Sequence, residues 1–235
     1  MSYKSILIAL GFSLLLSVGQ AVAQTPNRAA SLAPAGAPSL GPVTAPVTIV
    51  EFFDPACESC RAMYPHVKQL LAAYPKDVRL VIRYVPFHGQ VSKEAIGVLE
   101  AAREQKKFEP VLETLMRNQP VWASHGASDP KKVWEFAVAA GLDRVRAERY
   151  LATGAVETLI KREVAAVEAA DIRGTPTFFV NGKLLSELGP QQLSALVATE
   201  LQRTRKKPLS WRGLPRYSAG SDDVEKDHDV VPPRP

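Results

Sequence analysis

Two cysteines separated by two residues, Cys57 and Cys60, are the only cysteines of the 235-residue sequence. They follow a compact β-branched and aromatic run, residues 47–53, which predicts a buried strand. After them, apolar residues recur at helical spacing as far as Tyr74. A disulfide closing so short a loop restricts little of the unfolded chain. The pair therefore indicates chemistry rather than a structural staple.

The predicted position of Cys57, at the junction of strand and helix, suits a nucleophile. Backbone N–H groups at a helix start are unpaired and carry the positive end of the helix dipole. They stabilise a thiolate, which lowers a cysteine pKa from about 8.5 into the range of about 3.5–7.5. Cys60 lies one helical turn further on, where its thiol can attack a mixed disulfide formed by Cys57 and release the partner.

The order of predicted elements indicates an α/β fold with a mixed four-stranded sheet. A strand–helix–strand unit should be parallel, and Asn181-Gly182 between two apolar runs is a strong hairpin signal. Between these two parts, Ala, Glu, Lys, Leu and Val dominate a block of helical patterns. The expected elements are a strand at 47–53, a helix at 57–74, a strand at 78–85, a helical block at about 92–170, a hairpin at 176–185 and a helix at 190–203.

The two ends of the chain differ in character from the predicted domain, residues 46–205. Residues 1–23 carry a positive charge at Lys4, continue as an apolar run and end in Ala-Val-Ala. This pattern is typical of a cleaved signal peptide. An uncleaved membrane anchor is the alternative. Residues 24–45, rich in Pro, Ala, Gly and Ser, predict a flexible leader. Residues 206–235, polar and Pro-rich, predict an irregular or disordered tail.

The charge pattern argues against nucleic acid as a partner. The formal net charge is +5, and acidic and basic residues are interleaved along the chain. A nucleic-acid-binding surface needs clustered basic residues.

Other uses of the cysteine pair remain as alternatives. A zinc site would need more ligands, and the histidines show no ligand spacing beside the pair. Two inert buried thiols are a further possibility. Two thiolates with Met63 nearby could also hold Cu(I), which prefers soft sulfur ligands. We predict no bound cofactor or metal beyond the redox-active disulfide itself.

Two further features bear on the pair. Glu51 stands in the middle of the apolar strand, where it is either solvent-facing or a semi-buried carboxylate that relays the proton of Cys60. Thr175-Pro176 opens the second strand region, either as an ordinary trans turn or with a cis bond that exposes backbone for a substrate peptide. Arg83, on the strand predicted at 78–85, could pair with Glu51, but an exposed side chain is the expectation.

The motifs Val-Glu-Phe-Phe-Asp-Pro-x-Cys-x-x-Cys and Gly-Thr-Pro-Thr-Phe-Phe-Val-Asn-Gly resemble the thioredoxin superfamily. The long helical block between them resembles its DsbA-like branch, over about residues 46–203. The resemblance implies that Cys57 is the nucleophile, Cys60 the resolving cysteine and Pro176 a cis-proline facing the pair. It also matches Glu51 to the buried acid of the family.

The resemblance further implies a periplasmic protein thiol–disulfide oxidoreductase that acts on exported cysteine-containing proteins. Its redox partner would be a membrane protein, DsbB-like for an oxidase or DsbD-like for a reductase or isomerase. The direction of electron flow stays open at this point.

Glu58-Ser59 stands where many strong oxidants of the branch have Pro-His. The imidazole donor is missing, and Glu58 places a negative charge beside the nucleophile, which opposes the thiolate. We therefore predict a pKa of Cys57 that is lowered less than in Pro-His members, and a milder oxidant. Thr175 before the proline resembles isomerase and reductase members.

Overall fold

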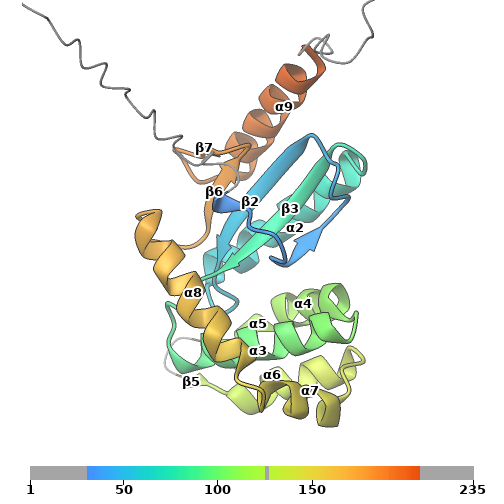
Figure 1. Ribbon diagram of the computed structural model, residues 1–235, viewed down its shortest axis with the longest axis vertical. Helices are drawn as coiled ribbons and strands as arrows, with labels where there is room; N and C mark the ends of the chain where they lie inside the picture. Colours follow the sequence, from blue (N-terminus) through green and yellow to red (C-terminus); the bar gives the residue numbers. More distant parts are fainter. Residues whose placement is uncertain (1–30, 125–126, 207–235) are drawn as a thin grey trace, which may run out of the picture.

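The computed structural model describes residues 31–124 and 127–206, and its main sheet is mixed (Figure 1). Within this part of the chain the strand order is β1-β3-β2-β6-β7. The central pair β2 and β3 runs parallel, and the other neighbours are antiparallel. The strands are β1 (Ser39–Leu40), β2 (Val47–Phe53), β3 (Val78–Tyr84), β6 (Thr177–Val180) and β7 (Lys183–Leu184).

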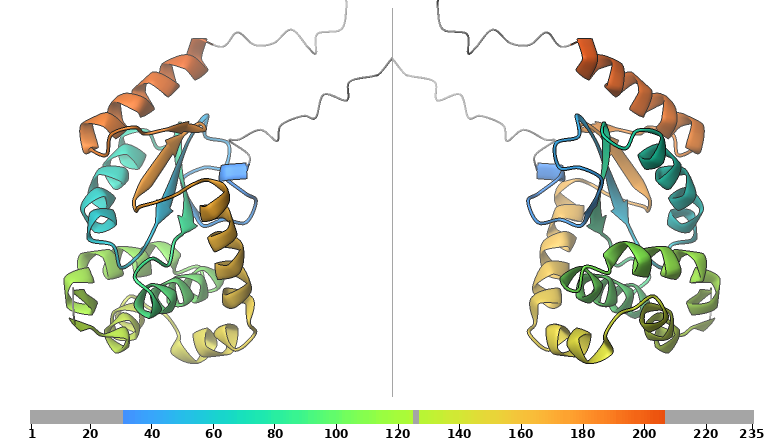
Figure 2. Two further views of the ribbon diagram at one scale, coloured as in Figure 1. Left: turned by 90° about the vertical axis from the view of Figure 1, so that its left-hand side faces the viewer. Right: turned by 90° about the vertical axis from the view of Figure 1, so that its right-hand side faces the viewer.

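Helices cover both faces of this sheet. Figure 2 shows α2 (Glu58–Ala73) and α9 (Pro190–Lys206) on one side and α8 (Ala155–Ala169) on the other. Val67 of α2 and Leu193 of α9 join one buried cluster with Ile49 of β2. Val167 of α8 joins a second cluster with Phe52, which points to the opposite face of β2. Alternate residues of one strand thus belong to two separate cores, as expected for a sheet buried on both sides.

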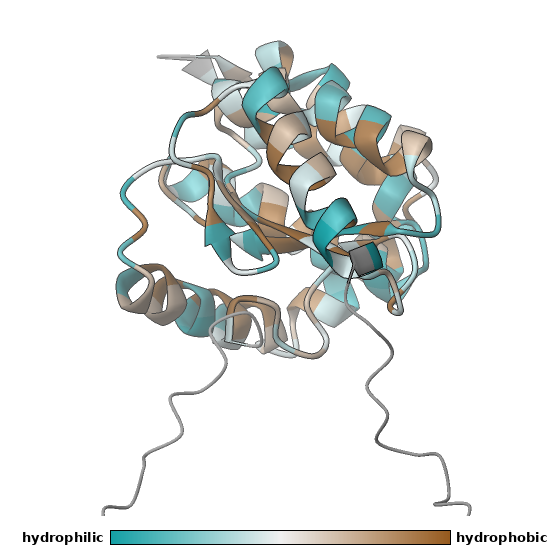
Figure 3. Ribbon diagram, turned by 90° about the horizontal axis from the view of Figure 1, so that it is seen from above, coloured by the Kyte–Doolittle hydropathy of each residue, from teal (hydrophilic) through white to brown (hydrophobic). Residues whose placement is uncertain are grey.

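The predicted helical block forms a compact insertion below the sheet (Figure 1). Figure 3 shows that the helices of the molecule carry both hydrophilic and hydrophobic residues, as amphipathic helices that cover a core do. The first helix of the insertion, α3, is central and packs against α4, α6, α7 and α8. The elements are α3 (Gln90–Glu104), α4 (Phe108–Arg117), α5 (Gln119–Trp122), β4 (Ala123–Ser124), β5 (Ala127–Ser128), α6 (Pro130–Ala139) and α7 (Arg144–Leu151). No helix within the described ranges is both long and apolar enough to cross a membrane.

The thioredoxin-type fold predicted from the sequence is confirmed, including the hairpin at Asn181-Gly182. These two residues have φ angles of 47° and 81°, as a two-residue type I′ turn requires. The expected count of four strands is wrong for the described residues, because β1 adds a fifth at the free edge of β3. Two residues are too few to produce a periodic pattern, so this strand gave no signal.

The described part of the predicted leader also needs correction, since it packs on the sheet from residue 31 onward. Leu32 is buried, and the carbonyl oxygen of Pro38 accepts a hydrogen bond from the N–H of Ile82 at 2.8 Å. The predicted signal peptide, the start of the leader and the tail from 207 lie outside the described residues.

Arg83 is buried, which corrects its expected exposure. Its Nε donates to Glu163 of α8 at 2.7 Å, and its Nη1 donates to the carbonyl oxygen of Leu32 at 2.9 Å. The guanidinium also lies over the ring of Phe52, 5.4 Å from its centroid. Arg83 therefore links the N-terminal segment, the sheet and α8. The sequence could not reveal this, because the partner acid is 80 residues away.

Candidate functional site

Cys57 is the N-cap residue of α2, between the end of β2 and the first helical turn. Its backbone is extended, and its carbonyl oxygen accepts the first helical hydrogen bond, from the N–H of Arg61 at 3.1 Å. The Sγ atom of Cys57 lies 3.2 Å from the carbonyl oxygen of Thr175. The cysteine pair and the Thr175-Pro176 segment, distant in sequence, thus form one site.

The surroundings of Cys57 favour its thiolate and lower its pKa from 9.0 to about 5. The largest cause is a hydrogen bond from the thiol of Cys60, while partial burial acts in the opposite direction. The side chain of Thr175 and the backbone N–H groups of Ser59 and Cys60 also stabilise the thiolate. Only the protonated thiol of Cys57 can donate a hydrogen bond to the carbonyl of Thr175. When the thiolate forms, this hydrogen bond is lost, and the sulfur accepts hydrogen bonds from the donors named above.

The surroundings of Cys60 favour its protonated thiol, so the two cysteines are chemically distinct. Its side chain is fully buried, and this burial raises its pKa well above 9.0. The hydrogen bond to Cys57 and the negative charges of Glu51 and Cys57 act in the same direction. At neutral pH Cys57 therefore has the larger thiolate fraction of the two, and Cys60 would need a base before it could react.

Glu51 supplies a carboxyl group on the buried side of the pair. It lies on the central strand β2 and is 1% exposed. Burial, followed by the charge of Cys57, raises the pKa of Glu51 from 4.5 to about 8. Its Oε1 atom has no hydrogen-bond partner among the described residues. A group with such a pKa can take or release a proton near neutral pH.

Thr175 and Pro176 form the wall opposite the cysteines. Their peptide bond is cis, Pro176 is buried and Thr175 is half-buried. The next residue, Thr177, opens β6 and pairs with Phe52 of β2. This antiparallel pairing brings the Thr175 carbonyl to the end of β2 where Cys57 lies.

Glu58 and Ser59, between the two cysteines, expose their side chains on the first turn of α2. The backbone N–H of Ser59 faces the Cys57 thiolate. The tuning that we predicted for these two side chains stays a prediction.

Asp54 and His88 were not singled out from the sequence, although both belong to the site. The buried carboxylate of Asp54 accepts hydrogen bonds from the N–H of Ala56 at 2.9 Å and from the ring Nδ1 of His88 at 2.8 Å. The backbone N–H of Asp54 also contacts Cys60. An Asp whose side chain accepts a hydrogen bond from the backbone N–H two residues later is a recognised turn motif. The long-range contact with His88 has no sequence signature.

Gln119 is a second residue that the sequence did not reveal. It comes from the helical insertion, is 1% exposed and donates to the carbonyl oxygens of Pro55 and Cys57. A single glutamine within a helical block carries no signal of its own.

Comparison with known proteins agrees with this fold. A thioredoxin family model matches residues 35–199. A thioredoxin-like oxidoreductase from Silicibacter pomeroyi is 32% identical, with a TM-score of 0.64 over 77% of this chain and 98% of that chain. BdbD from Bacillus subtilis is 24% identical, with a TM-score of 0.62 over 71% and 94% of the two chains, and supports the fold.

Curated relatives fall into two groups. The thiol:disulfide interchange protein DsbA of Bordetella parapertussis is 27% identical over 60% of this chain and 66% of its own length. A Na(+)/H(+) antiporter NhaA of Salinispora tropica is 33% identical over 77% of this chain, but the match spans only 28% of the antiporter. The chain belongs to the thioredoxin family, and its relatives include DsbA-like thiol–disulfide oxidoreductases.

Proposed function

We propose that this protein is an exported thiol–disulfide oxidoreductase that exchanges disulfides with other exported proteins through Cys57 and Cys60. The observation that carries the proposal is the opposed environment of the two thiols. The pKa of Cys57 is lowered to about 5, whereas that of the buried Cys60 is raised. A reactive thiolate beside a protonated thiol is the arrangement that two-step disulfide exchange requires.

In the reducing direction, the Cys57 thiolate attacks one sulfur of a substrate disulfide. A Cys57–substrate disulfide forms, and the other substrate sulfur leaves as a thiolate. Cys60 then loses its proton and attacks the sulfur of Cys57. The Cys57–Cys60 disulfide forms, the second substrate sulfur leaves, and two electrons have passed to the substrate. The oxidising direction is the reverse sequence of steps.

Glu51 is proposed as the group that exchanges a proton with Cys60. Its charge acts on Cys60, and its own pKa of about 8 lies between that of the Cys57 thiolate and that of the buried Cys60 thiol. Its unpaired Oε1 is free, among the described residues, to accept that proton. In the resolving step the carboxylate would take the proton, and in the reverse step the acid would return it.

The Thr175-Pro176 segment is proposed to bind the substrate backbone beside Cys57. The carbonyl of Thr175 faces Sγ of Cys57, so a substrate cysteine joined to Cys57 would lie against the backbone of this segment, next to the start of β6. A pocket of about 480 Å³ continues from it and is lined in part by Pro176, Phe178 and Leu188. Half of the Leu188 side chain is exposed, which suits an apolar substrate residue.

A membrane partner and a direction of exchange are proposed by analogy with the DsbA-like relatives. DsbA-like relatives support a periplasmic oxidase that a DsbB-like membrane protein reoxidises. A reductase or isomerase kept reduced by a DsbD-like donor is the alternative within the same chemistry. Transport is not proposed, because the match covers a minor part of the antiporter relatives.

Two assays together test the proposal. The wild-type protein should catalyse insulin reduction with dithiothreitol or the oxidative refolding of reduced ribonuclease, and Cys57→Ser should abolish both activities. A copper-binding dithiol, with Met63 nearby, would instead bind Cu(I) stoichiometrically and show no Cys57-dependent exchange. That second result would overturn the proposed function.

A further inference from the structure

Gln119 connects the helical insertion to the turn that carries Cys57. It is the first residue of α5, and its Nε2 donates to the carbonyl oxygen of Pro55 at 2.8 Å and to that of Cys57 at 2.9 Å. Both amide hydrogens are therefore used on two carbonyls of one short turn. The turn is 62 to 64 residues away in the sequence, so this bridge is a tertiary contact between the two parts of the fold.

Arg61 fixes the orientation of that amide. Its Nε donates to Oε1 of Gln119 at 3.2 Å. A primary amide has nearly the same shape when its oxygen and nitrogen are exchanged, so its direction depends on its partners. A reversed amide would place an oxygen against two carbonyl oxygens. Arg61 therefore selects the orientation in which the donors face the turn.

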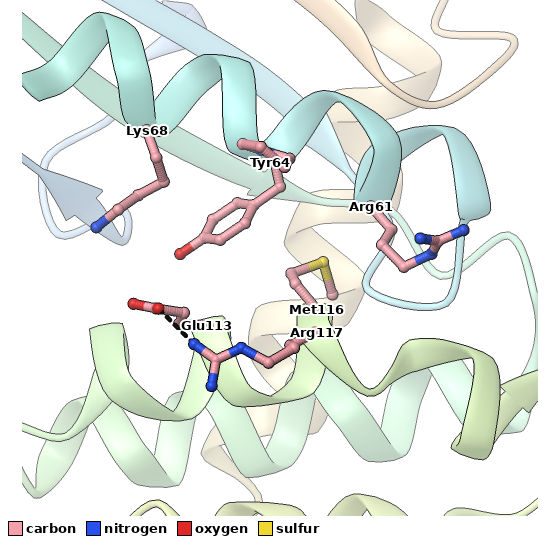
Figure 4. Close-up of a pocket in the computed structure, with 7 residues that line it drawn as sticks. Arg61, Tyr64, Lys68, Glu113, Met116 and Arg117 are labelled. Carbon is pink, nitrogen blue, oxygen red and sulfur yellow. Dashed lines mark hydrogen bonds and ion pairs between the residues drawn. The ribbon is translucent and has the colours of Figure 1, made fainter. Parts of the chain in front are cut away.

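Arg61 also lines a pocket between α2 and α4. In Figure 4, Tyr64 and Lys68 extend from α2 toward α4, whereas the guanidinium of Arg61 turns aside along the start of α2. Together with residues of α4 they line a pocket of about 400 Å³. Arg61 lies one helical turn beyond Cys57, and its backbone N–H bonds to the carbonyl of Cys57. One residue thus contacts the Cys57 carbonyl through its backbone and Gln119 through its side chain.

The turn held by Gln119 is the one that presents donors to the Cys57 sulfur. The N–H of Cys57 bonds to the carbonyl of Asp54 at 3.0 Å, and its own carbonyl is held by Arg61 and Gln119. The N–H groups of Ser59 and Cys60, which face the thiolate, follow in the same turn. Without Gln119, the carbonyl groups of Pro55 and Cys57 would each lose one hydrogen-bond donor. Because unsatisfied buried carbonyls are costly, the turn would shift toward other donors.

We propose that Gln119, oriented by Arg61, is a positioning residue that holds the Cys57 turn in the geometry in which the thiolate is formed and reacts. The inference rests on the proposed role of Cys57 as nucleophile. It assigns to the helical insertion a part in tuning the redox pair, because Gln119 belongs to the insertion and not to the sheet.

The test compares Gln119→Met with Gln105→Met. Methionine keeps the approximate shape of glutamine and removes its donors. Gln105 is a matched control: it also makes two side-chain hydrogen bonds to backbone, with the N–H and the carbonyl of Asp143, at an exposed edge of the insertion. The ultraviolet absorbance of the thiolate is titrated in each reduced protein, and the reduction potential is measured against glutathione.

For Q119M we expect the Cys57 pKa to rise by about one unit and the protein to become a weaker oxidant by up to about 30 mV, the equivalent of a tenfold change. Q105M should titrate as the wild type does. Gln119→Glu should raise the Cys57 pKa further, because an ionised carboxylate would face, and be repelled by, two carbonyl oxygens. If Q119M titrates as the wild type, or if Q105M shifts equally, the positioning role is wrong.

Arg61→Met provides an independent check if Q119M does not fold. It leaves Gln119 in place and removes the donor to Oε1, so the Cys57 pKa should rise in the same direction by a smaller amount. An unchanged pKa in folded R61M would overturn the orienting role of Arg61. An ordinary thiol pKa in the wild-type protein would instead contradict the proposed function.

Discussion

The Sγ atom of Cys57 lies 3.2 Å from the carbonyl oxygen of Thr175, a residue 118 positions further along the chain. The contact joins the N-terminus of α2 to the start of β6. It exists because β2 pairs with β6 in antiparallel register, with Phe52 opposite Thr177. The sulfur with the lowered pKa is thereby set beside the backbone that leads into β6, where the proposed function places the substrate.

Separate replacement of the two cysteines should divide the reaction into its steps. Cys57→Ser should lose all exchange activity, since no other cysteine has a lowered pKa. Cys60→Ser should form mixed disulfides with substrates and release them slowly, because the resolving thiol is missing. Non-reducing electrophoresis after incubation with a disulfide-containing protein measures this. Mixed disulfides that accumulate in C57S rather than in C60S would reverse the assigned roles.

Glu51→Gln should stabilise the reduced protein at neutral pH while slowing catalysis. In the folded protein Glu51 keeps its proton up to about pH 8, whereas its ordinary pKa is 4.5. The unfolding free energy therefore falls as pH rises between these values, and glutamine removes a cost of about 3 kcal/mol at pH 7. Denaturant unfolding at pH 4 and pH 7 measures the gain, which should be present only at pH 7.

The same variant tests the proton relay. We expect E51Q to lower turnover about tenfold or more, and to leave alkylation of Cys57 close to its wild-type rate, because the relay serves Cys60. Equal turnover in E51Q and wild type would remove Glu51 from the mechanism.

The Cys57 thiolate should make the stability of the reduced protein depend on pH. The pKa of Cys57 falls from 9.0 to about 5 on folding, so the unfolded chain binds more protons between these values. The unfolding free energy contributed by Cys57 should therefore rise from pH 5 toward pH 9 and vanish below pH 5. Glu51 has the opposite slope, so the comparison is made between reduced E51Q and reduced E51Q/C57S. A difference that is independent of pH from 4 to 8 would contradict the lowered pKa.

The buried ion pair of Arg83 and Glu163 should contribute more to the unfolding free energy than exposed ion pairs do. Glu163→Gln leaves a buried guanidinium with a weaker partner and should cost about 3–5 kcal/mol of unfolding free energy. Glu148→Gln, which alters the exposed pair with Arg144, is the matched control and should cost less than about 1 kcal/mol. Equal losses in the two variants would show that burial of the pair does not determine its strength.

Local patterns were sufficient to predict most of the secondary structure. The run at 47–53, the helical repeats of the insertion and Asn181-Gly182 each carry their signal within a few residues. The structure has β2, the helices α3, α4 and α6 to α8, and the β6–β7 hairpin at those places. Pairings that depend on distant partners were missed. The two-residue β1 needs the edge of β3, and Arg83 needs Glu163, which no local pattern announces.

The residues of the candidate site also divide into those that local motifs predicted and those that only the structure reveals. Cys57, Cys60, Glu51 and the Thr175-Pro176 segment were found because they belong to motifs that can be recognised along the chain. Gln119 reaches the site from the insertion, so only the folded structure shows that it holds the carbonyl of Cys57.

The reduction potential of the Cys57–Cys60 pair tests the central claim most directly. It can be obtained by equilibrating the protein with glutathione buffers and quantifying the free thiols. A thiol–disulfide oxidoreductase with a low-pKa Cys57 and without Pro-His between the cysteines should have a potential between about −270 and −120 mV, more negative than the strongest oxidants of this kind. A potential below about −300 mV, typical of a structural disulfide, would contradict the account.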